Sequence, residues 1–392
     1  MPARSRLPTT VWMLGLVSLF MDLSSEMIYG LLPVFLTTVV GASALAVGLI
    51  EGVAEATASF MKLVSGAWSD RMGKRKPLAV LGYGLAALSK PFFPLADTAA
   101  MVLGARIVDR VGKGIRGAPR DALIADVTQS GTRGAAFGLR QSLDTVGAFS
   151  GPLLAVALMA VFSGDMRAVF AVAIVPALIS VAILVLGVKE PPRAAPVRGA
   201  GPRFDRTLLT RLPRAFWLLL LVTAPFMLAR FSEAFLLLRA QSLGLALALI
   251  PLTLVVMNVV YAASAYPAGR LSDRWPQARL LLLGCIVLLA ANLCLALGDS
   301  LAWAAAGTVL WGLHMGLTEG LIAALVADRA PVTLRGTAFG VMHFSRGVLL
   351  LAASALAGWL WDASGPQATF LAGAGFAVLT LLMLPLLPRA MR

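Results

Sequence analysis

The sequence predicts an all-α membrane protein of about twelve transmembrane helices in two pseudo-symmetric six-helix bundles. Three observations predict this fold class: an apolar composition, apolar runs of membrane-spanning length, and an internal repeat on either side of a basic linker. Hydrophobic residues occupy 59% of the 392 positions and charged residues 13%, and the mean hydropathy is +0.86. A soluble protein of this length needs more polar surface, so the solvent around this chain is mainly lipid.

Uncharged apolar runs long enough to cross a bilayer recur along the chain. They cover residues 168–188, 240–269, 280–298 and 368–388. Other apolar runs carry isolated charges. The basic N-terminal segment is not followed by a small-residue cleavage site, so we expect no removable signal peptide.

The net charge of +14 is explained by topology. With the N-terminus inside, the basic residues gather in alternate loops, whereas the opposite loops hold only Arg167 and Arg239. This positive-inside pattern predicts that both termini are cytoplasmic. It also removes the need for a nucleic-acid partner, and we expect none.

A segment rich in Pro, Gly and Arg divides the chain. We predict an N-terminal six-helix bundle over 1–188, a cytoplasmic linker over 189–213 and a C-terminal six-helix bundle over 214–392. The motif Gly66-Ala-Trp-Ser-Asp-Arg71 returns in the second half as Gly269-Arg-Leu-Ser-Asp-Arg274. Two similar bundles that meet at a central site form the architecture that alternating access requires.

These motifs resemble those of the major facilitator superfamily over the whole chain. Segment 66–76 resembles the loop between helices 2 and 3 of that family, and its echo at Gly269 resembles the loop between helices 8 and 9. Segment 110–118 resembles the helix-4 motif, with Lys113 where glutamine is usual and Arg116 where glycine is usual. The resemblance implies the major facilitator fold and a transporter in the bacterial inner membrane.

A set of residues fits the helix-5 spacing of drug and metabolite antiporters in that family, and we expect it to allow close helix packing. The set is Gly138, Gly147, Gly151 and Pro152. The closing glycine pair of the family pattern is replaced by Ala155 and Val156.

Charged residues also lie inside the apolar segments, where an ionised group costs at least about 2.5–3.5 kcal/mol at the bilayer centre. They must therefore face one another or water. Those of the N-terminal half are Asp22, Glu26, Glu51, Glu55, Lys62, Lys90, Arg106, Asp109, Arg110, Lys113, Arg116, Arg120, Asp121, Arg140 and Asp144. Those of the C-terminal half are Arg230, Glu233, Glu319 and Arg346.

A rise of about 1.5 Å per residue places four of these acids near the membrane midplane, where a poorly solvated carboxylate exchanges protons near neutral pH. We predict Asp22 and Glu55 as the proton site, with Arg110 as the competing cation and Asp109 or Asp144 modulating it. The alternative is that all five are salt-bridged and never titrate.

A larger set is predicted to line the substrate cavity. It comprises Glu26, Glu51, Arg106, Lys113, Arg140, Arg230, Glu233, Asn258, Tyr261, His314 and Glu319. Within it, Arg106 and Lys113 are either anion contacts for a substrate or partners of nearby acids. His314 is interpreted as a hydrogen-bonding residue of the cavity. Glu233 is either a second protonatable group or an internal partner of Arg230.

Acids and bases of the repeated loop motif predict a cytoplasmic gate, since an acid there can cap a helix and pair with a base. The predicted gating residues are Gly66, Asp70, Arg71, Gly73, Lys74, Arg75, Asp126, Gly269, Asp273, Arg274 and Asp328. The alternative is a topology signal, which explains the basic residues but not the aspartates.

Together these features predict a secondary active transporter that exports a small organic solute in exchange for protons. One rival is a transporter of an anionic metabolite held by the bases of helix 4. Another is a membrane-embedded enzyme or lipid scramblase, but we see no nucleophile–base set and expect no enzymatic activity. With two His and two Cys, we also expect no metal and no cofactor. The expected partners are a small-molecule substrate, protons and membrane lipid. We take the protein as a monomer, a point on which the sequence is silent.

Overall fold

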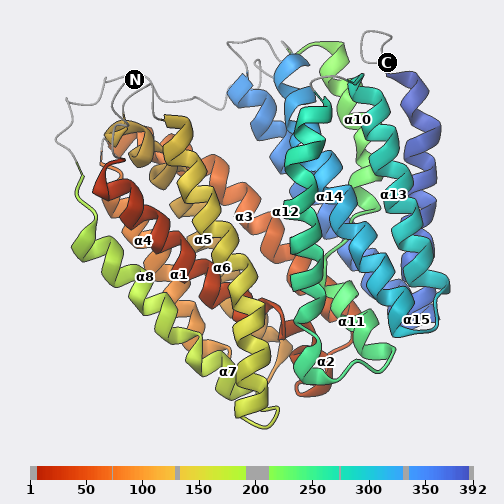
Figure 1. The fold of residues 1–392 in the computed structure, drawn as a ribbon, viewed down its shortest axis with the longest axis horizontal. Coiled ribbons are helices and arrows are strands. Elements are labelled where there is room, and N and C mark those ends of the chain that lie inside the picture. Colours follow the sequence, from red (N-terminus) through yellow and green to blue (C-terminus); the bar gives the residue numbers. More distant parts are fainter. Residues whose placement is uncertain are drawn as a thin grey trace. The chain divides into compact units, whose positions relative to one another are not determined.

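Apolar segments in lipid must satisfy their backbone hydrogen bonds internally, which favours helices. The computed structural model describes residues 7–72, 74–128, 133–190, 212–272, 275–329 and 335–387, and every regular element in these ranges is helical (Figure 1). The elements in chain order are α1 (Thr9–Tyr29), α2 (Leu32–Thr38), α3 (Ala44–Met72), α4 (Lys76–Ser89), η1 (Lys90–Phe92), α5 (Ala99–Val127), α6 (Arg133–Val161), α7 (Met166–Val172), α8 (Ile174–Gly187), α10 (Arg214–Leu228), α11 (Ala234–Ser242), η3 (Leu247–Leu249), α12 (Leu252–Ser272), α13 (Gln277–Leu297), α14 (Leu301–Arg329), α15 (Arg335–Met383) and η5 (Leu384–Leu386).

Short breaks divide some membrane crossings, and one turn joins two of them. Helices α1 and α2 form one crossing, as do α4 with η1, α7 with α8, and α10 with α11. The long helix α15 contains Gly365 with a φ of 85°, followed by Pro366, and this turn separates two crossings. The helices therefore supply the twelve crossings that the sequence predicts.

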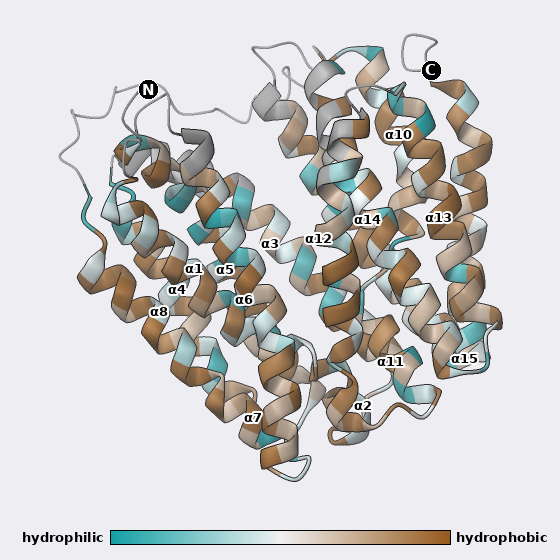
Figure 2. Ribbon diagram, viewed as in Figure 1, coloured by the Kyte–Doolittle hydropathy of each residue, from teal (hydrophilic) through white to brown (hydrophobic). Residues whose placement is uncertain are grey.

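Within the described residues, seven segments are apolar and long enough to cross a membrane by length and composition alone. They are Thr9–Thr38, Ala44–Lys62, Ala136–Val161, Met166–Gly187, Leu247–Ala265, Gln277–Leu297 and Ala338–Leu386. Helix α5 is not among them because charged residues interrupt it. Figure 2 shows the contrast between polar positions on α5 and the mainly hydrophobic helix α13.

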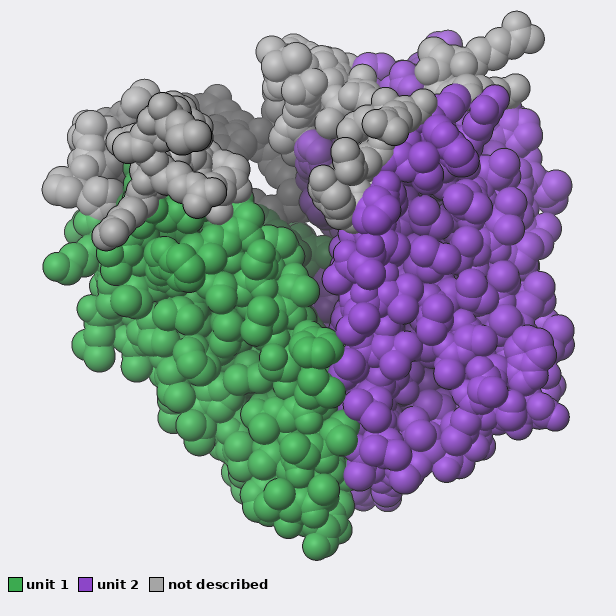
Figure 3. All heavy atoms as spheres, in the orientation of Figure 1, with its two compact units in different colours: residues 1–32, 57–203 green, residues 33–56, 204–392 purple. Residues whose placement is uncertain are grey.

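The chain forms two compact units (Figure 3). Unit 1 contains residues 1–32 and 57–203, and unit 2 contains 33–56 and 204–392. Helix α3 thus contributes its first part to unit 2 and its second part to unit 1. The division predicted from the sequence differs, because it keeps residues 33–56 with the N-terminal bundle. The predicted domain boundaries at 189–213 remain a prediction.

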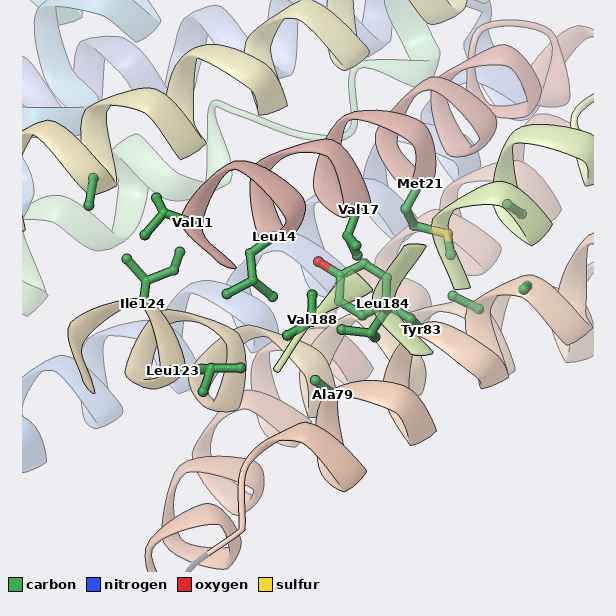
Figure 4. Close-up of a cluster of buried hydrophobic side chains, with 14 residues drawn as sticks. Val11, Leu14, Val17, Met21, Ala79, Tyr83, Leu123, Ile124, Leu184 and Val188 are labelled. Atoms are coloured by element: carbon green, nitrogen blue, oxygen red, sulfur yellow. The ribbon is translucent and has the colours of Figure 1, made fainter. Parts of the chain in front are cut away.

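In unit 1, α1 packs chiefly on α6 and α8, while α4 packs on α5. Apolar side chains of α1, α4, α5 and α8 form its buried cluster, in which Leu14, Val17 and Tyr83 are fully buried (Figure 4). Glycines bring α4 and α5 into backbone contact, since a Cβ on Gly82 would lie 2.7 Å from the carbonyl oxygen of Gly112. Leu123 and Ile124 of α5 belong to this cluster, which fixes the helix that carries the charges.

In unit 2, α14 packs on α12 and α13, and α15 packs on α10 and α13. Aromatic rings fill its interior. The Phe231 ring lies 5.5 to 5.6 Å from those of Phe235, Trp311 and Phe370. Such ring pairs contribute beyond their buried area, so this unit has an apolar interior into which few charges enter.

Candidate functional site

Helix α5 carries the charged face of unit 1. Its N-terminus is capped by Thr98, whose hydroxyl accepts a hydrogen bond from the backbone N–H of Met101 at 3.2 Å. Arg106, Asp109 and Arg110 lie buried on this helix at 3–6% exposure, and Arg116 and Arg120, also buried, follow about two and three turns later. Charges this deep must be compensated by neighbours from other helices.

The most deeply buried ion pair joins α5 to η1. Lys90 is 1% exposed and Asp109 4% exposed, and the Lys90 ammonium lies 2.9 Å from the Asp109 carboxylate. The same ammonium donates to the Ser25 hydroxyl of α1 at 3.0 Å. The Arg110 guanidinium lies 3.9 Å from the other Asp109 oxygen. Asp109, predicted to modulate proton coupling, is thus held as the anion of a charge cluster.

Asp22, one of the two predicted proton carriers, is also ion-paired. The Arg116 guanidinium lies 3.3 Å from the Asp22 carboxylate and 4.5 Å from the centre of the Tyr83 ring. Arg120 pairs with Asp121 at 2.9 Å and donates to the Ser18 hydroxyl at 2.9 Å.

Asp144, on α6, is a third acid that is held in an ion pair. It pairs with Arg140 one turn earlier on the same helix, and Arg140 also lies 3.9 Å from Asp121. The ion-paired alternative therefore describes Asp22, Asp109 and Asp144 in this structure. Their role in proton coupling remains a prediction.

Glu26 differs from these acids. It lies one turn after Asp22 on α1 and is half-buried, and its carboxylate makes no hydrogen bond or ion pair with any residue that the structure describes. Lys113, Arg110 and Arg106 act on its carboxylate electrostatically. Within the described part of unit 1, it is the intramembrane acid without an ion pair.

Glycines of α6 fix the position of this stretch of α1. A Cβ on Gly147 would lie 2.5 Å from the carbonyl oxygen of Leu19, and a Cβ on Gly151 would lie 2.6 Å from the Glu26 Cβ. Gly138 has open space around it instead, and Pro152 is buried within α6. The close approach expected of the helix-5 glycines is therefore found at Gly147 and Gly151.

Glu51 and Glu55 lie on the part of α3 that belongs to unit 2. Glu51 is 2% exposed. Glu55 acts electrostatically on Arg346 of α15. The two predicted proton carriers, Asp22 and Glu55, thus belong to different compact units.

The charges of unit 2 gather at one acid. Glu319 of α14 accepts a hydrogen bond from Arg230 at 2.7 Å and two from Arg346 at 2.9 and 3.0 Å. Arg230 lies in the break between α10 and α11, with its guanidinium 5.7 Å from the centre of the Phe226 ring. Glu233, in the same break, acts electrostatically on Arg346.

Two other predicted cavity residues of unit 2, His314 and Tyr261, lie within the electrostatic reach of this cluster. His314 is fully buried, and its imidazole packs edge-on against Trp311 at 5.3 Å and Phe226 at 6.3 Å. Tyr261 is half-buried within the electrostatic reach of Glu319. Asn258 is half-buried on α12.

Two of the predicted gating residues form an ion pair, and their role in gating remains a prediction. Arg75 lies 3.2 Å from Asp126, and Lys74 is exposed. The Glu190 carboxylate accepts from the backbone N–H groups of Arg75 and Lys76 at 2.5 and 3.3 Å, so it caps the start of α4. Among the other predicted gating residues, Gly73, Asp273 and Arg274 lie outside the described residues, and the side chains of Gly66, Asp70, Arg71, Gly269 and Asp328 lie outside the described set.

Sequence reasoning assigned no role to several residues that shape these clusters. The sequence could have pointed to a buried ion pair at Lys90, because Lys90 is a lone cation in an apolar run. The sequence could not have pointed to Ser18, Tyr83 or Glu190, since a hydroxyl, or a charge at the end of a helix, is common in any helical protein. The sequence likewise gave no indication that Asp362 caps α3.

The comparisons with known proteins agree with this architecture. The family model of the Major Facilitator Superfamily matches residues 14–354 and 240–391. The chain belongs to the Major Facilitator Superfamily. It is therefore a multi-pass membrane transporter, and the predicted fold class and family are confirmed.

Individual relatives of this superfamily support the assignment. The chain is 33% identical to an MFS-type transporter of Methanocaldococcus jannaschii over 387 residues, which cover 96% of this chain and 94% of that protein. It is 30% identical to the multidrug resistance protein MdtH of Photorhabdus laumondii over 137 residues, 35% of this chain and 34% of that one. The nucleoside transporter NupG superposes with a TM-score of 0.79 at 12% identity, over 96% of this chain and 99% of that chain, a likeness of fold alone.

Proposed function

We propose that this chain is a secondary active transporter that exports a small organic solute in exchange for protons, and that the Glu26 carboxylate carries the exchanged proton. One observation supports this choice. Asp22, Asp109 and Asp144 each have a cation in contact, whereas Glu26 makes no ion pair with a described residue.

The physical reason lies in what protonation costs. Protonating an ion-paired carboxylate leaves its cation poorly compensated, so such a group keeps its charge. Protonating Glu26 breaks no ion pair. Lys113, Arg110 and Arg106 favour its ionised form electrostatically without an ion pair to it, which makes both charge states accessible.

Antiport follows if proton and solute compete for this one group. A positively charged or hydrogen-bond-donating group of the solute binds the ionised carboxylate and is excluded while the proton is there. Alternating access, the mechanism of transporters built from two repeats, then exposes the group to each side of the membrane in turn. Each half-cycle carries either the proton or the solute.

The test uses purified protein in vesicles that contain a pH-sensitive dye, with the solute chosen by a thermal-shift screen of metabolites and drugs. Glu26→Gln should abolish solute-driven proton movement while solute counterflow persists. Asp97→Asn is the control, since that loop carboxylate is 81% exposed. Unchanged proton movement in Glu26→Gln overturns the assignment.

The same assay separates Glu26 from the pair that the sequence favours. Asp22→Asn combined with Glu55→Gln should retain proton movement if Glu26 is the carrier. If the double variant loses proton movement and Glu26→Gln retains it, the carriers are Asp22 and Glu55. Asp22→Asn is expected to lower stability, because Arg116 then loses its carboxylate.

We also propose an inner-membrane location with both termini in the cytoplasm. The basic loops on one side of the predicted topology support it. Labelling of single cysteines in intact cells tests it: a cysteine introduced at Lys189 should be protected from an impermeant reagent, and one introduced at Asp97 should react.

A further inference from the structure

The start of α4 and the end of α8 meet at one corner of unit 1. The two helices pack against each other. The Glu190 carboxylate, which follows α8, accepts from the backbone N–H groups of Arg75 and Lys76 at 2.5 and 3.3 Å. The Lys76 ammonium in turn donates to the Val185 carbonyl of α8 at 2.8 Å. These three hydrogen bonds hold the two helix ends side by side.

The carboxylates of this corner are engaged, whereas its lysines are not ion-paired. Glu190 caps α4, and Asp126 pairs with Arg75 at 3.2 Å. Three ammonium groups form no ion pair with any residue that the structure describes, namely those of Lys74, Lys76 and Lys189. Lys74 and Lys189 are also exposed. The corner therefore carries positive charge that no described carboxylate compensates.

The surface next to these lysines is apolar. The segment that ends here, Met166–Gly187, is the most apolar of the seven membrane-spanning segments in the described residues, and most of it is not buried. Near its end, Val185 is 45% and Leu186 81% exposed, and the exposed Lys189 follows three residues after Leu186. A helix end that passes within one turn from exposed leucine to exposed lysine is typical of the boundary between acyl chains and head groups.

We propose that this corner binds an anionic phospholipid, whose head-group phosphate is held by Lys76 and Lys189. Lys189 directly precedes Glu190, which touches the backbone of Lys76, so one phosphate is within reach of both side chains. Ammonium groups without a carboxylate partner attract a phosphate. The exposed Leu186 beside them offers a surface to an acyl chain, which favours a lipid over a soluble phosphate.

A head group in this position joins two helix ends. Lys76 lies in the first turn of α4, and Lys189 follows the last turn of α8. Near an anionic lipid surface each lysine contributes about a fivefold factor in affinity. The lysines of this corner together therefore give a preference of at least about tenfold for an anionic over a zwitterionic lipid. The proposal does not depend on which carboxylate carries the proton.

The experiment compares three probes on the purified full chain in detergent: short-chain phosphatidylglycerol, phosphatidylcholine with the same chains, and glycerol phosphate without chains. Phosphatidylglycerol should raise the melting temperature and bind at least about tenfold more tightly than either other probe. Equal binding of the two lipids overturns the proposal, because the site then does not select a net negative charge. Equal binding of glycerol phosphate also overturns it, because the site then recognises a free phosphate.

Variants then locate the site. Lys189→Met should weaken phosphatidylglycerol about fivefold, and Lys74→Met combined with Lys189→Met at least about tenfold. Both lysines are exposed and make no hydrogen bond or ion pair with a described residue, so these proteins should fold. Arg279→Met is the matched control, since Arg279 is an exposed cation in the first turn of α13 in unit 2. An equal loss in Arg279→Met and Lys189→Met overturns the proposal, because the attraction is then a general property of a basic protein.

Hydrogen exchange tests whether the head group joins the two helices. Phosphatidylglycerol should slow exchange in the first turn of α4, whereas phosphatidylcholine should leave it unchanged. In Lys76→Met the protection of α4 should be lost, while Lys189 still attracts the lipid. If phosphatidylglycerol binds the unmodified chain but exchange in α4 does not change, the head group contacts the end of α8 alone and the proposed bridge is wrong.

Discussion

The two units handle charge in different ways. Unit 1 distributes acids and bases over α1, α5 and α6 and joins most of them in several small networks, such as Asp109 with Lys90 and Arg110. Unit 2 surrounds aromatic rings with apolar helices and places two guanidiniums on the single carboxylate of Glu319. Several networks can leave a carboxylate outside them, as Glu26 shows, whereas a single shared acid ties its neighbours together. This difference supports our proposal that unit 1 carries the coupling.

The largest loss of stability is expected when the buried Lys90–Asp109 ion pair of unit 1 is broken. Lys90→Met leaves Asp109, 4% exposed, without its nearest cation, so we expect a loss of about 3–5 kcal/mol in the free energy of unfolding. Thermal unfolding in detergent measures it. The double variant Lys90→Met with Asp109→Leu should recover much of the loss, since it removes both charges. A double variant as unstable as the sum of the single variants would show that these side chains act through packing alone.

Glu319 is the corresponding test of unit 2. Glu319→Gln leaves Arg230 and Arg346 facing each other without their shared anion. We expect a loss of about 2–3 kcal/mol, less than for Lys90→Met because the Arg346 side chain is 43% exposed and water compensates part of its charge. The free energy of unfolding measures it. Arg346→Gln, which leaves the Arg230–Glu319 bond in place, should cost less, and the opposite order would contradict the shared-acid description.

The fold could be predicted from the sequence because apolar length and repetition are local signals. The pairing of charges could not, because it depends on which helices meet. Depth along the helix placed Asp22 near the midplane, but nothing in the chain near Asp22 indicates Arg116, which lies 94 positions away. Glu26 was placed with the substrate cavity for the same reason: its lack of an ion pair is visible only once α5 and α6 are in position.

The contact between α1 and α6 that positions Glu26 is expected to contribute less to stability. Gly151→Ala places a Cβ 2.6 Å from the Glu26 Cβ and 2.9 Å from the carbonyl oxygen of Leu23, so α1 must shift away from α6. We expect a loss of about 1–3 kcal/mol, measured by thermal unfolding. Gly138→Ala on the same helix meets no atom within 4 Å and should leave stability unchanged or slightly higher. Equal losses for the two variants would mean that helix propensity, not packing, decides the outcome.

The smallest loss of stability is expected for the helix caps, which can be compared between the two units. In unit 2, the two Asp362 oxygens accept from the backbone N–H groups of Ala44 and Leu45 at 2.9 and 2.8 Å, so the loop within α15 caps α3. In unit 1, Asp165 caps α7 from the adjacent position, accepting from the N–H of Arg167 at 2.9 Å.

Losing either cap should cost about 0.5–2 kcal/mol, with Asp362→Ala nearer the upper limit because that carboxylate joins segments distant in sequence. Hydrogen exchange of the first turn measures the effect for each helix. In Asp362→Ala, exchange should accelerate in the first turn of α3 and also in α15, where a Cβ on Gly358 would lie 2.4 Å from the carbonyl oxygen of Ala44. In Asp165→Ala it should accelerate in α7 alone. If the Asp362 change stays confined to α3, the cap is local, and the first part of α3 is held in unit 2 by its packing against α15.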